Sequence, residues 1–187
     1  IGTHPQGLPM TADINTQYDH PSEYVGRQIC AHGVQSPHIT ESLSPQEIFD
    51  AFFGSGQHDV DDDSRLLVPD GMSARAYAAQ IMREQLSATT GADYSEAGDA
   101  EFTDSLMYNV APSMSFWGGF YQNTVYRFRP NGLDPETSIM DIVILRPVPK
   151  DGPRPKPVPI MHLDFDEPVT LAGETMGEGL AVVFEQD

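Results

Sequence analysis

Apolar side chains in the first third of the chain recur at a helical period. This stretch contains the apolar residues Ile48, Phe49, Phe52 and Phe53. It follows Ser44-Pro45-Gln46-Glu47, which has the pattern of a capping box with proline in the first turn, and Gly54 is placed to end it. We therefore predict a short amphipathic helix from Ser44 that packs its phenylalanine side on a core.

A second helical pattern runs roughly from Ser73 to Leu86, before Gly91 stops it. Its apolar side consists of Ala74, Tyr77, Ala78, Ile81, Met82 and Leu86. Arg75, Arg83 and Glu84 lie elsewhere on the helix, as expected for an element with one solvated side. These two segments are the helices that the sequence predicts.

An acidic tract separates the two predicted helices. Its carboxylates at Asp59, Asp61, Asp63 and Asp70 fall at positions of a calcium-binding loop. However, Ser64 stands where the sharp turn of that loop needs glycine, and Asp70 stands where a bidentate glutamate is usual. We therefore interpret the tract as a solvated surface loop.

After Glu101 the pattern favours strands. The segments Leu106 to Trp117, Phe120 to Pro130 and Ser138 to Val148 are rich in Val, Ile, Tyr and Phe. The last two flank the turn-forming stretch Asn131-Gly132-Leu133-Asp134-Pro135. We predict that the three segments are adjacent antiparallel strands, because the connections between them are short.

Two segments show no sustained period. From Ile1 to Ile39 the chain is rich in Pro, Gly, His and Asn, and we predict loops with short extended pieces. Pro147 to Pro159 contains six prolines, which exclude a helix or a central strand. We predict that this second segment is an extended surface connector.

Length and charge narrow the class of function. The 187 residues, 39% of them hydrophobic, can bury one sizeable core, so we expect a single domain over residues 1–187. The net charge of −18 would repel nucleic acid and anionic membrane surfaces. No apolar run reaches the eighteen residues that suggest a membrane-spanning helix. Cys30 is the only cysteine, so the chain can form neither an internal disulfide nor a cysteine-ligated cluster. We expect a cytoplasmic protein.

Several short motifs, taken in order, carry a resemblance to a known family. They are Thr3-His4-Pro5-Gln6, Asp13-Ile14-Asn15-Thr16-Gln17-Tyr18-Asp19, Gly33-Val34-Gln35-Ser36-Pro37-His38, Val125 to Gly132, Ile142 to Pro149 and Val183 to Asp187. Together they span nearly the whole chain. The chain resembles the catalytic domain of the alpha subunit of Rieske non-haem iron ring-hydroxylating oxygenases. That resemblance implies a fragment, with the cluster domain and the first iron-ligand histidine upstream of Ile1.

The resemblance implies an iron site at the two ends of the chain. By it, His4 is an iron ligand and Asp187 is the carboxylate of a two-histidine, one-carboxylate triad, which leaves positions on Fe(II) open for oxygen. On the residues alone, His4 is a loop histidine before a proline and Asp187 is a surface acid. With only two of the three ligands, we expect the chain to bind iron weakly and to turn over no substrate.

The resemblance also places the substrate pocket. The pocket-lining residues that it implies are Met107, Trp117, Phe120 and Phe184, which on the residues alone are equally well explained as core. At the start of the central strand, Ala111-Pro112-Ser113 departs from the Phe-Pro-Asn that is common in the family. The remaining histidines are His20, His32, His38, His58 and His162. None forms an i, i+4 pair, and we interpret them as solvated or hydrogen-bonding, with His38 near the site.

The fold that the resemblance implies is α+β, a helix-grip (Bet v 1/START-like) antiparallel sheet whose helices enclose a cavity. The implied activity is Fe(II)- and O2-dependent hydroxylation of an aromatic or related apolar substrate, by mono- or dioxygenation. Electrons would come from NAD(P)H through a ferredoxin or reductase and a Rieske [2Fe-2S] cluster. The intact protein would be a homotrimer, with or without a beta subunit.

Two other functions fit the same composition. A helix-grip module without catalysis would enclose an apolar ligand and would have no use for a converging His4 and Asp187. An acidic partner-binding domain would expose an apolar patch instead of enclosing one. The metal ligands distinguish the first alternative from the oxygenase, and the position of the apolar residues distinguishes the second.

Overall fold

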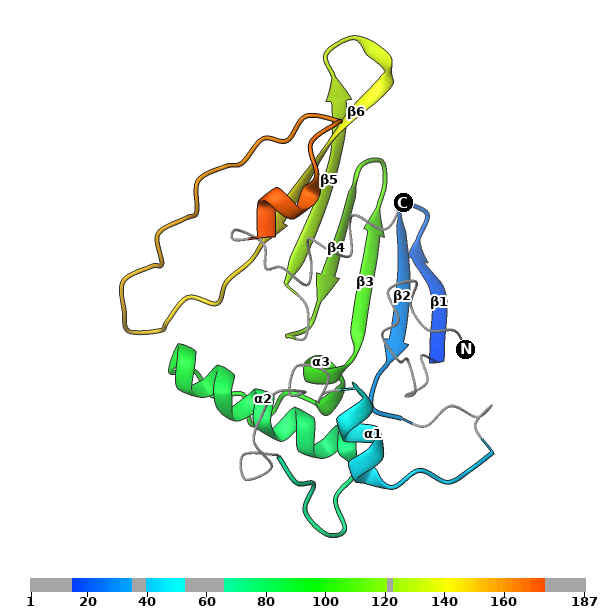
Figure 1. The fold of residues 1–187 in the computed structure, drawn as a ribbon, viewed down its shortest axis with the longest axis vertical. Coiled ribbons are helices and arrows are strands. Elements are labelled where there is room, and N and C mark those ends of the chain that lie inside the picture. The colour runs from blue at the N-terminus through cyan, green and yellow to red at the C-terminus, as the bar shows by residue number, and fades with distance from the viewer. Residues whose placement is uncertain (1–14, 35–39, 53–65, 121–122, 174–187) are drawn as a thin grey trace.

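The computed structural model describes residues 15–34, 40–52, 66–120 and 123–173. Its centre is a six-stranded antiparallel sheet in which sequence neighbours pair throughout, in the order β1-β2-β3-β4-β5-β6 (Figure 1). The strands are β1 (Asn15–Ser22), β2 (Val25–Ala31), β3 (Ser105–Val110), β4 (Met114–Gly118), β5 (Thr124–Asn131) and β6 (Asp134–Ile144). The helices are α1 (Pro45–Phe52), α2 (Ala74–Thr90) and α3 (Asp99–Thr103), with a 3-10 turn η2 (Val169–Ala172). The predicted α+β class is confirmed.

Before Ile39 we predicted loops with short extended pieces, and the structure has two full strands there, β1 and β2. β1 is almost entirely polar and contains Pro21 next to its register shift, both of which are tolerated in an edge strand. β2 pairs with β3, and β1 pairs with β2, so the hydrogen bonds of β1 come from a strand that already belongs to the sheet. The partner strand therefore decides the conformation of β1, and its own apolar pattern does not.

The predicted strand Leu106 to Trp117 is two strands. β3 and β4 form a hairpin that turns at Ala111-Pro112-Ser113, where the chain reverses and the register pairs Val110 with Met114. The predicted antiparallel arrangement of this segment with the next two is confirmed. The β5–β6 hairpin also turns where predicted, with Gly132 at a φ of 62° between Asn131 and Asp134.

Both predicted helices form, with the predicted start signals. The Ser44 hydroxyl accepts from the Glu47 backbone N–H at 3.2 Å, and the Glu47 carboxylate accepts from the Ser44 backbone N–H at 2.7 Å, which closes the capping box of α1. Ser73 caps α2, which ends at Gly91 with a φ of 71°. The helices pack together through a small core of Phe49, Ala74 and Ala78.

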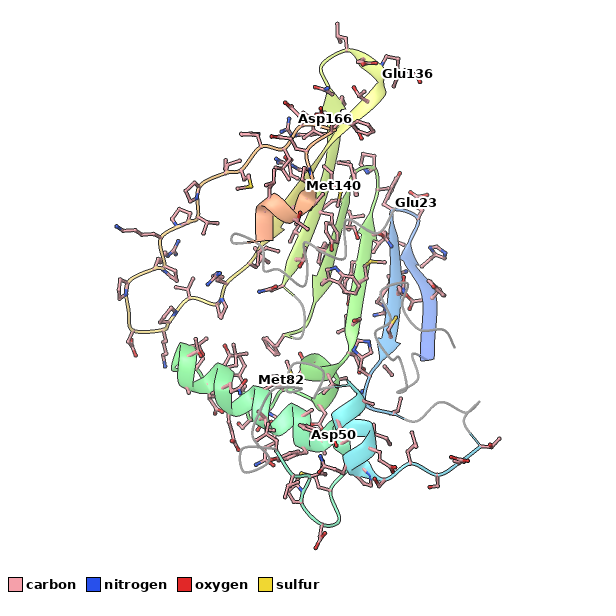
Figure 2. All side chains as sticks on the ribbon, viewed as in Figure 1. Glu23, Asp50, Met82, Glu136, Met140 and Asp166 are labelled. Atoms are coloured by element: carbon pink, nitrogen blue, oxygen red, sulfur yellow. The ribbon has the colours of Figure 1, made fainter. Side chains whose placement is uncertain are left out.

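The helices gather at one end of the sheet, around the end of β2 and the start of β3 (Figure 1). In Figure 2, Asp50 and Met82 mark this helical end, whereas Glu23 and Glu136 mark strand turns at the opposite end. The segment 145–168 that follows β6 forms no helix or strand, which agrees with the connector predicted for Pro147 to Pro159, whereas the strand predicted to reach Val148 ends at Ile144. Its Lys150 N–H donates to the Thr90 carbonyl at 2.7 Å, which ties it to the end of α2.

Within the described ranges, no helix combines the length and the apolar character that crossing a membrane requires.

Candidate functional site

The residues predicted to form the site fall into two groups. His4, Phe184 and Asp187 lie outside the described residues, as does the predicted proximity of His4 to Asp187. Met107, Trp117 and Phe120 are described. Met107 on β3 and Trp117 on β4 are directly opposite each other in the register, so their side chains lie on the same face of the sheet.

The strand register divides the sheet into two chemically different faces. On the face that holds Met107 and Trp117, here called the Trp117 face, the paired positions outside the β5–β6 turn carry no Asp, Glu, Lys or Arg. Its residues include Tyr18, Gln28, Cys30, Met107, Asn109, Ser115, Trp117, Thr124, Tyr126, Phe128, Met140, Ile142 and Ile144. Cys30, Ser115 and Thr124 are buried there. This face is therefore apolar with small, uncharged polar groups.

The opposite face, here called the Tyr108 face, carries the ion pairs of the sheet. Asp19 pairs with Arg27 at one side, and the guanidinium of Arg27 lowers the pKa of that carboxyl. At the other side Asp141 accepts from both Arg129 and Arg127, which lower the pKa of its carboxyl in the same way.

Stacked rings occupy the middle of the Tyr108 face. The rings of Tyr108 and Phe116 are 5.2 Å apart and nearly parallel, at 14°. Gly118 makes room for the stack, because a Cβ at that position would lie 3.0 Å from the Tyr108 ring. The charged side chains and the two rings of this face therefore have partners within the sheet. The Trp117 face is the better candidate for a ligand.

Two rows of side chains cross the Trp117 face. One row contains Gln28, Met107 and Trp117, which follow one another across β2, β3 and β4. The neighbouring row contains Gly26, Asn109, Ser115 and Tyr126, and it ends on Ile142 of β6. The first row is mainly apolar, whereas the second offers an amide and hydroxyl groups.

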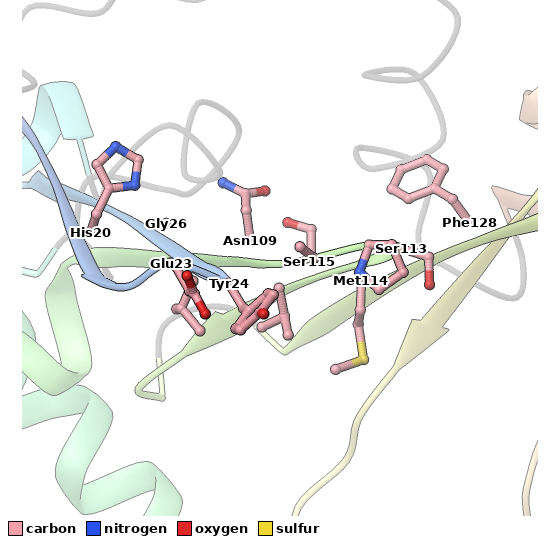
Figure 3. A pocket seen from close by; sticks show the side chains of 13 residues that line it. His20, Glu23, Tyr24, Gly26, Asn109, Ser113, Met114, Ser115 and Phe128 are labelled. Carbon is pink, nitrogen blue, oxygen red and sulfur yellow. The ribbon is translucent and has the colours of Figure 1, made fainter.

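A hollow of about 480 Å³ lies at the turn end of the sheet and includes part of the second row. Figure 3 shows His20, Asn109 and Ser115 on one side of the sheet, with Tyr24 and Met114 on the other. Gly26 has no side chain to fill the space between His20 and Asn109. A Cβ at this position would lie in van der Waals contact with both, 3.7 Å from Nδ1 of His20 and 4.0 Å from Cβ of Asn109. Sequence reasoning missed this polar group, because no motif joins its members.

Phe120 lies in different surroundings. It follows the end of β4 and packs against Tyr94 and Phe102, with ring centroids 5.2 Å and 4.9 Å away. The Phe102 ring also carries the guanidinium of Arg83, at 4.8 Å from its centroid. Phe120 is 39% exposed, and the contacts that the structure gives it are with this helical cluster. They do not join it to Met107 and Trp117.

A buried polar network lies where the sheet meets the helices. Arg75 of α2 forms a two-pronged ion pair with Asp104, and it also donates to the carbonyl of His32 at 2.9 Å. Asp104 accepts from the His32 backbone N–H at 3.2 Å. The His32 ring lies 2.9 Å from the carbonyl of Thr103, and burial lowers the pKa of this imidazole. The network joins three elements and is best explained as structural.

Comparison with known proteins gives no match: no family, no curated protein and no solved structure shows significant similarity to this chain.

Proposed function

We propose that this chain is the catalytic domain of a Rieske-type ring-hydroxylating oxygenase, in which the Trp117 face forms one wall of a pocket for an aromatic substrate. The observation that carries the proposal is the Met107–Trp117 pair. These two residues, named as pocket-lining from the sequence resemblance, are directly opposite each other, and the paired positions around them on this face carry no Asp, Glu, Lys or Arg. An aromatic ring needs such a wall, because charged groups would have to be desolvated against it.

The iron would be held by His4, Asp187 and one further histidine. The described residues contain no group of three His, Cys, Asp or Glu side chains that could hold a metal, and both ligands that the resemblance implies lie outside them. When bound, Fe(II) supplies the oxygen-activating chemistry, with electrons from NAD(P)H through a ferredoxin or reductase and a [2Fe-2S] cluster. Met107 and Trp117 would hold the ring and keep water from it. The sheet and helices would then form a helix-grip fold in a homotrimer.

Turnover and iron binding test this proposal together. The chain as it stands should bind Fe(II) weakly in an anaerobic titration and should hydroxylate nothing when reductase is supplied. A longer protein that extends upstream through a cluster domain should hydroxylate an aromatic substrate, and His4→Ala or Asp187→Ala should abolish that activity. His162→Ala, an exposed residue of the 145–168 connector, is the matched control and should retain it. Activity that survives His4→Ala would contradict the ligand assignment.

A non-catalytic module that binds an apolar ligand is the second candidate. The Met107–Trp117 pair would serve this module equally well, because the module needs an apolar wall and no metal. It predicts that aromatic ligands bind equally well to the His4→Ala and Asp187→Ala variants and that Fe(II) has no effect on that binding. The oxygenase predicts that the same variants lose Fe(II).

A further inference from the structure

Beside the Met107–Trp117 row, the Trp117 face carries a row of uncharged hydrogen-bonding groups. We propose that this row binds a neutral polar substituent, such as a hydroxyl, carbonyl or amide, of an aromatic ligand whose ring lies on Met107 and Trp117. The inference deepens the proposed function and rests on it: the substrate would be a polar-substituted aromatic compound and not a plain hydrocarbon.

The register sets the distance between the two parts of the ligand. Met107 and Asn109 are two residues apart on β3, and Trp117 and Ser115 are two apart on β4. Two residues of an antiparallel strand span about 6.8 Å, and side chains two apart point to the same face. One ligand can therefore contact the apolar row with its ring and reach the amide of Asn109 with a substituent.

Two side chains of the row that contains Asn109 and Ser115, here called the polar row, can form hydrogen bonds with a ligand. Within the part of the chain that the structure describes, the side chains of Asn109 and Ser115 form no hydrogen bonds. Ser115 is nevertheless only 8% exposed. A hydroxyl and an amide beside a hollow can bind a ligand group at little cost, because no hydrogen bond among the described residues has to break. Gly26 keeps the floor of the hollow free, and His20 borders it.

The charge of the face selects a neutral substituent. No Arg or Lys occupies the paired positions of the Trp117 face, so a carboxylate would lose its hydration without gaining a guanidinium or ammonium partner, and His20 is the one imidazole among the described residues beside the hollow. The net charge of −18 adds repulsion against any anion. No Asp or Glu occupies the paired positions around Asn109 and Ser115 either, and the Glu23 that also borders the hollow lies on the other side of the sheet, so an ammonium group has no counter-ion beside this row. Hydroxyl, carbonyl and amide groups remain.

Trp117 provides a built-in reporter, because it is the only tryptophan of the chain. Its indole N–H gives the only indole signal in a ¹H–¹⁵N correlation spectrum, and titrations of that signal measure binding at this position without metal or turnover. We would titrate three compounds with the same ring system: naphthalene, 2-naphthol and 2-naphthoate. We expect 2-naphthol to bind about tenfold tighter than naphthalene, and 2-naphthoate to bind more weakly than 2-naphthol.

Substitution at the polar row then tests the assignment. Asn109→Leu should remove the preference for 2-naphthol and leave the affinity for naphthalene unchanged or higher. Asn131→Leu, at the exposed β5–β6 turn, is the matched control and should preserve the preference. The backbone spectrum of each variant shows whether it is folded, and Asn109→Ala replaces Asn109→Leu if leucine prevents folding.

Three results would overturn the inference. Equal affinity for naphthalene and 2-naphthol would remove the polar subsite and leave the aromatic wall of the proposed function intact. Tighter binding of 2-naphthoate would show that a charged group is preferred. If none of the three compounds shifts the Trp117 signal, both the subsite and the aromatic wall fail. Loss of Fe(II) binding or of turnover in the ligand variants concerns the iron site alone, so the two proposals can fail separately.

Discussion

At the scale of single residues, the ion pair between Arg75 and Asp104 is the contact whose loss should cost the most. The Asp104 side chain is 7% exposed and its carboxylate is held by both prongs of the guanidinium. Arg75→Met leaves this acid buried without its cation, and we expect a loss of about 3 kcal/mol in the free energy of unfolding. Chemical denaturation measures it.

The matched control for Arg75→Met is Arg127→Met. Arg127 also pairs with an aspartate, but its side chain is 60% exposed and Arg129 still holds Asp141. We expect little change in stability from this substitution, because exposed ion pairs contribute little. Equal losses in the two variants would show that the Arg75 pair is not a buried anchor between α2 and the start of β3.

Burial of His32 predicts a pH dependence of stability. Because burial lowers the pKa of His32 in the folded state, the unfolded chain binds more protons at this residue between the folded value and the usual value of about 6.5. Stability should therefore fall as the pH is lowered through this window. His32→Gln should flatten that part of the stability profile, whereas His162→Gln, at an exposed position, should leave it unchanged. A slope that survives His32→Gln would assign it to other groups.

At the scale of elements, the connection between α3 and the end of β4 depends on Gly119. Its φ is 73°, and a Cβ added there would lie 2.7 Å from the carbonyl oxygen of Glu101. The same carbonyl accepts from the Phe120 N–H at 2.6 Å, so it cannot move away freely. We expect Gly119→Ala to lower the free energy of unfolding by about 2–3 kcal/mol.

Gly132→Ala separates the two causes of that loss. Gly132 has a similar φ of 62°, but no atom lies within 4 Å of an added Cβ. This substitution therefore measures the cost of the left-handed backbone alone, about 1 kcal/mol. If Gly119→Ala and Gly132→Ala destabilise the protein equally in thermal or chemical denaturation, the close approach of Glu101 contributes nothing.

The helices could be predicted from nearby residues, whereas the first strands and the β3–β4 hairpin could not. Both helices were predictable because Ser44, Glu47, Ser73 and Gly91 act through hydrogen bonds or backbone angles within their own turn. β1 was not predictable, because its polar sequence becomes a strand only by pairing with β2. The β3–β4 hairpin was missed because the apolar pattern continues on both sides of Ala111-Pro112-Ser113.

In the candidate site too, single residues could be named from the sequence, whereas their arrangement depends on how the strands pair. Met107 and Trp117 could be named from the resemblance, but their pairing depends on the hairpin register that the sequence did not reveal. Gly26, Asn109 and Ser115 are ordinary residues far apart in sequence, and only the order of β2, β3 and β4 places them in one row. The same holds for His32 and Asp104, which are 72 positions apart.

At the scale of the whole molecule, negative charge dominates. The chain has 28 Asp and Glu against 10 Lys and Arg, so 18 carboxylates remain in excess even if every cation is paired. The ion pairs of the sheet lie on its Tyr108 face, and they neutralise only a small part of this excess. Mutual repulsion among the remaining carboxylates should therefore destabilise the folded state more than the exposed ion pairs stabilise it.

Salt should consequently raise the melting temperature at neutral pH. Between about 0.01 M and 0.1 M monovalent salt the screening length falls from about 30 Å to about 10 Å, which weakens repulsion across the domain more than contacts within ion pairs. The same salt series near the isoelectric pH of about 4.4 serves as the control, since the net charge vanishes there and the salt effect should disappear. A melting temperature that falls with salt at pH 7 would mean that the ion pairs of the Tyr108 face and the Arg75–Asp104 pair outweigh the repulsion. That result would make the distribution of charge, rather than its net value, the determinant of stability.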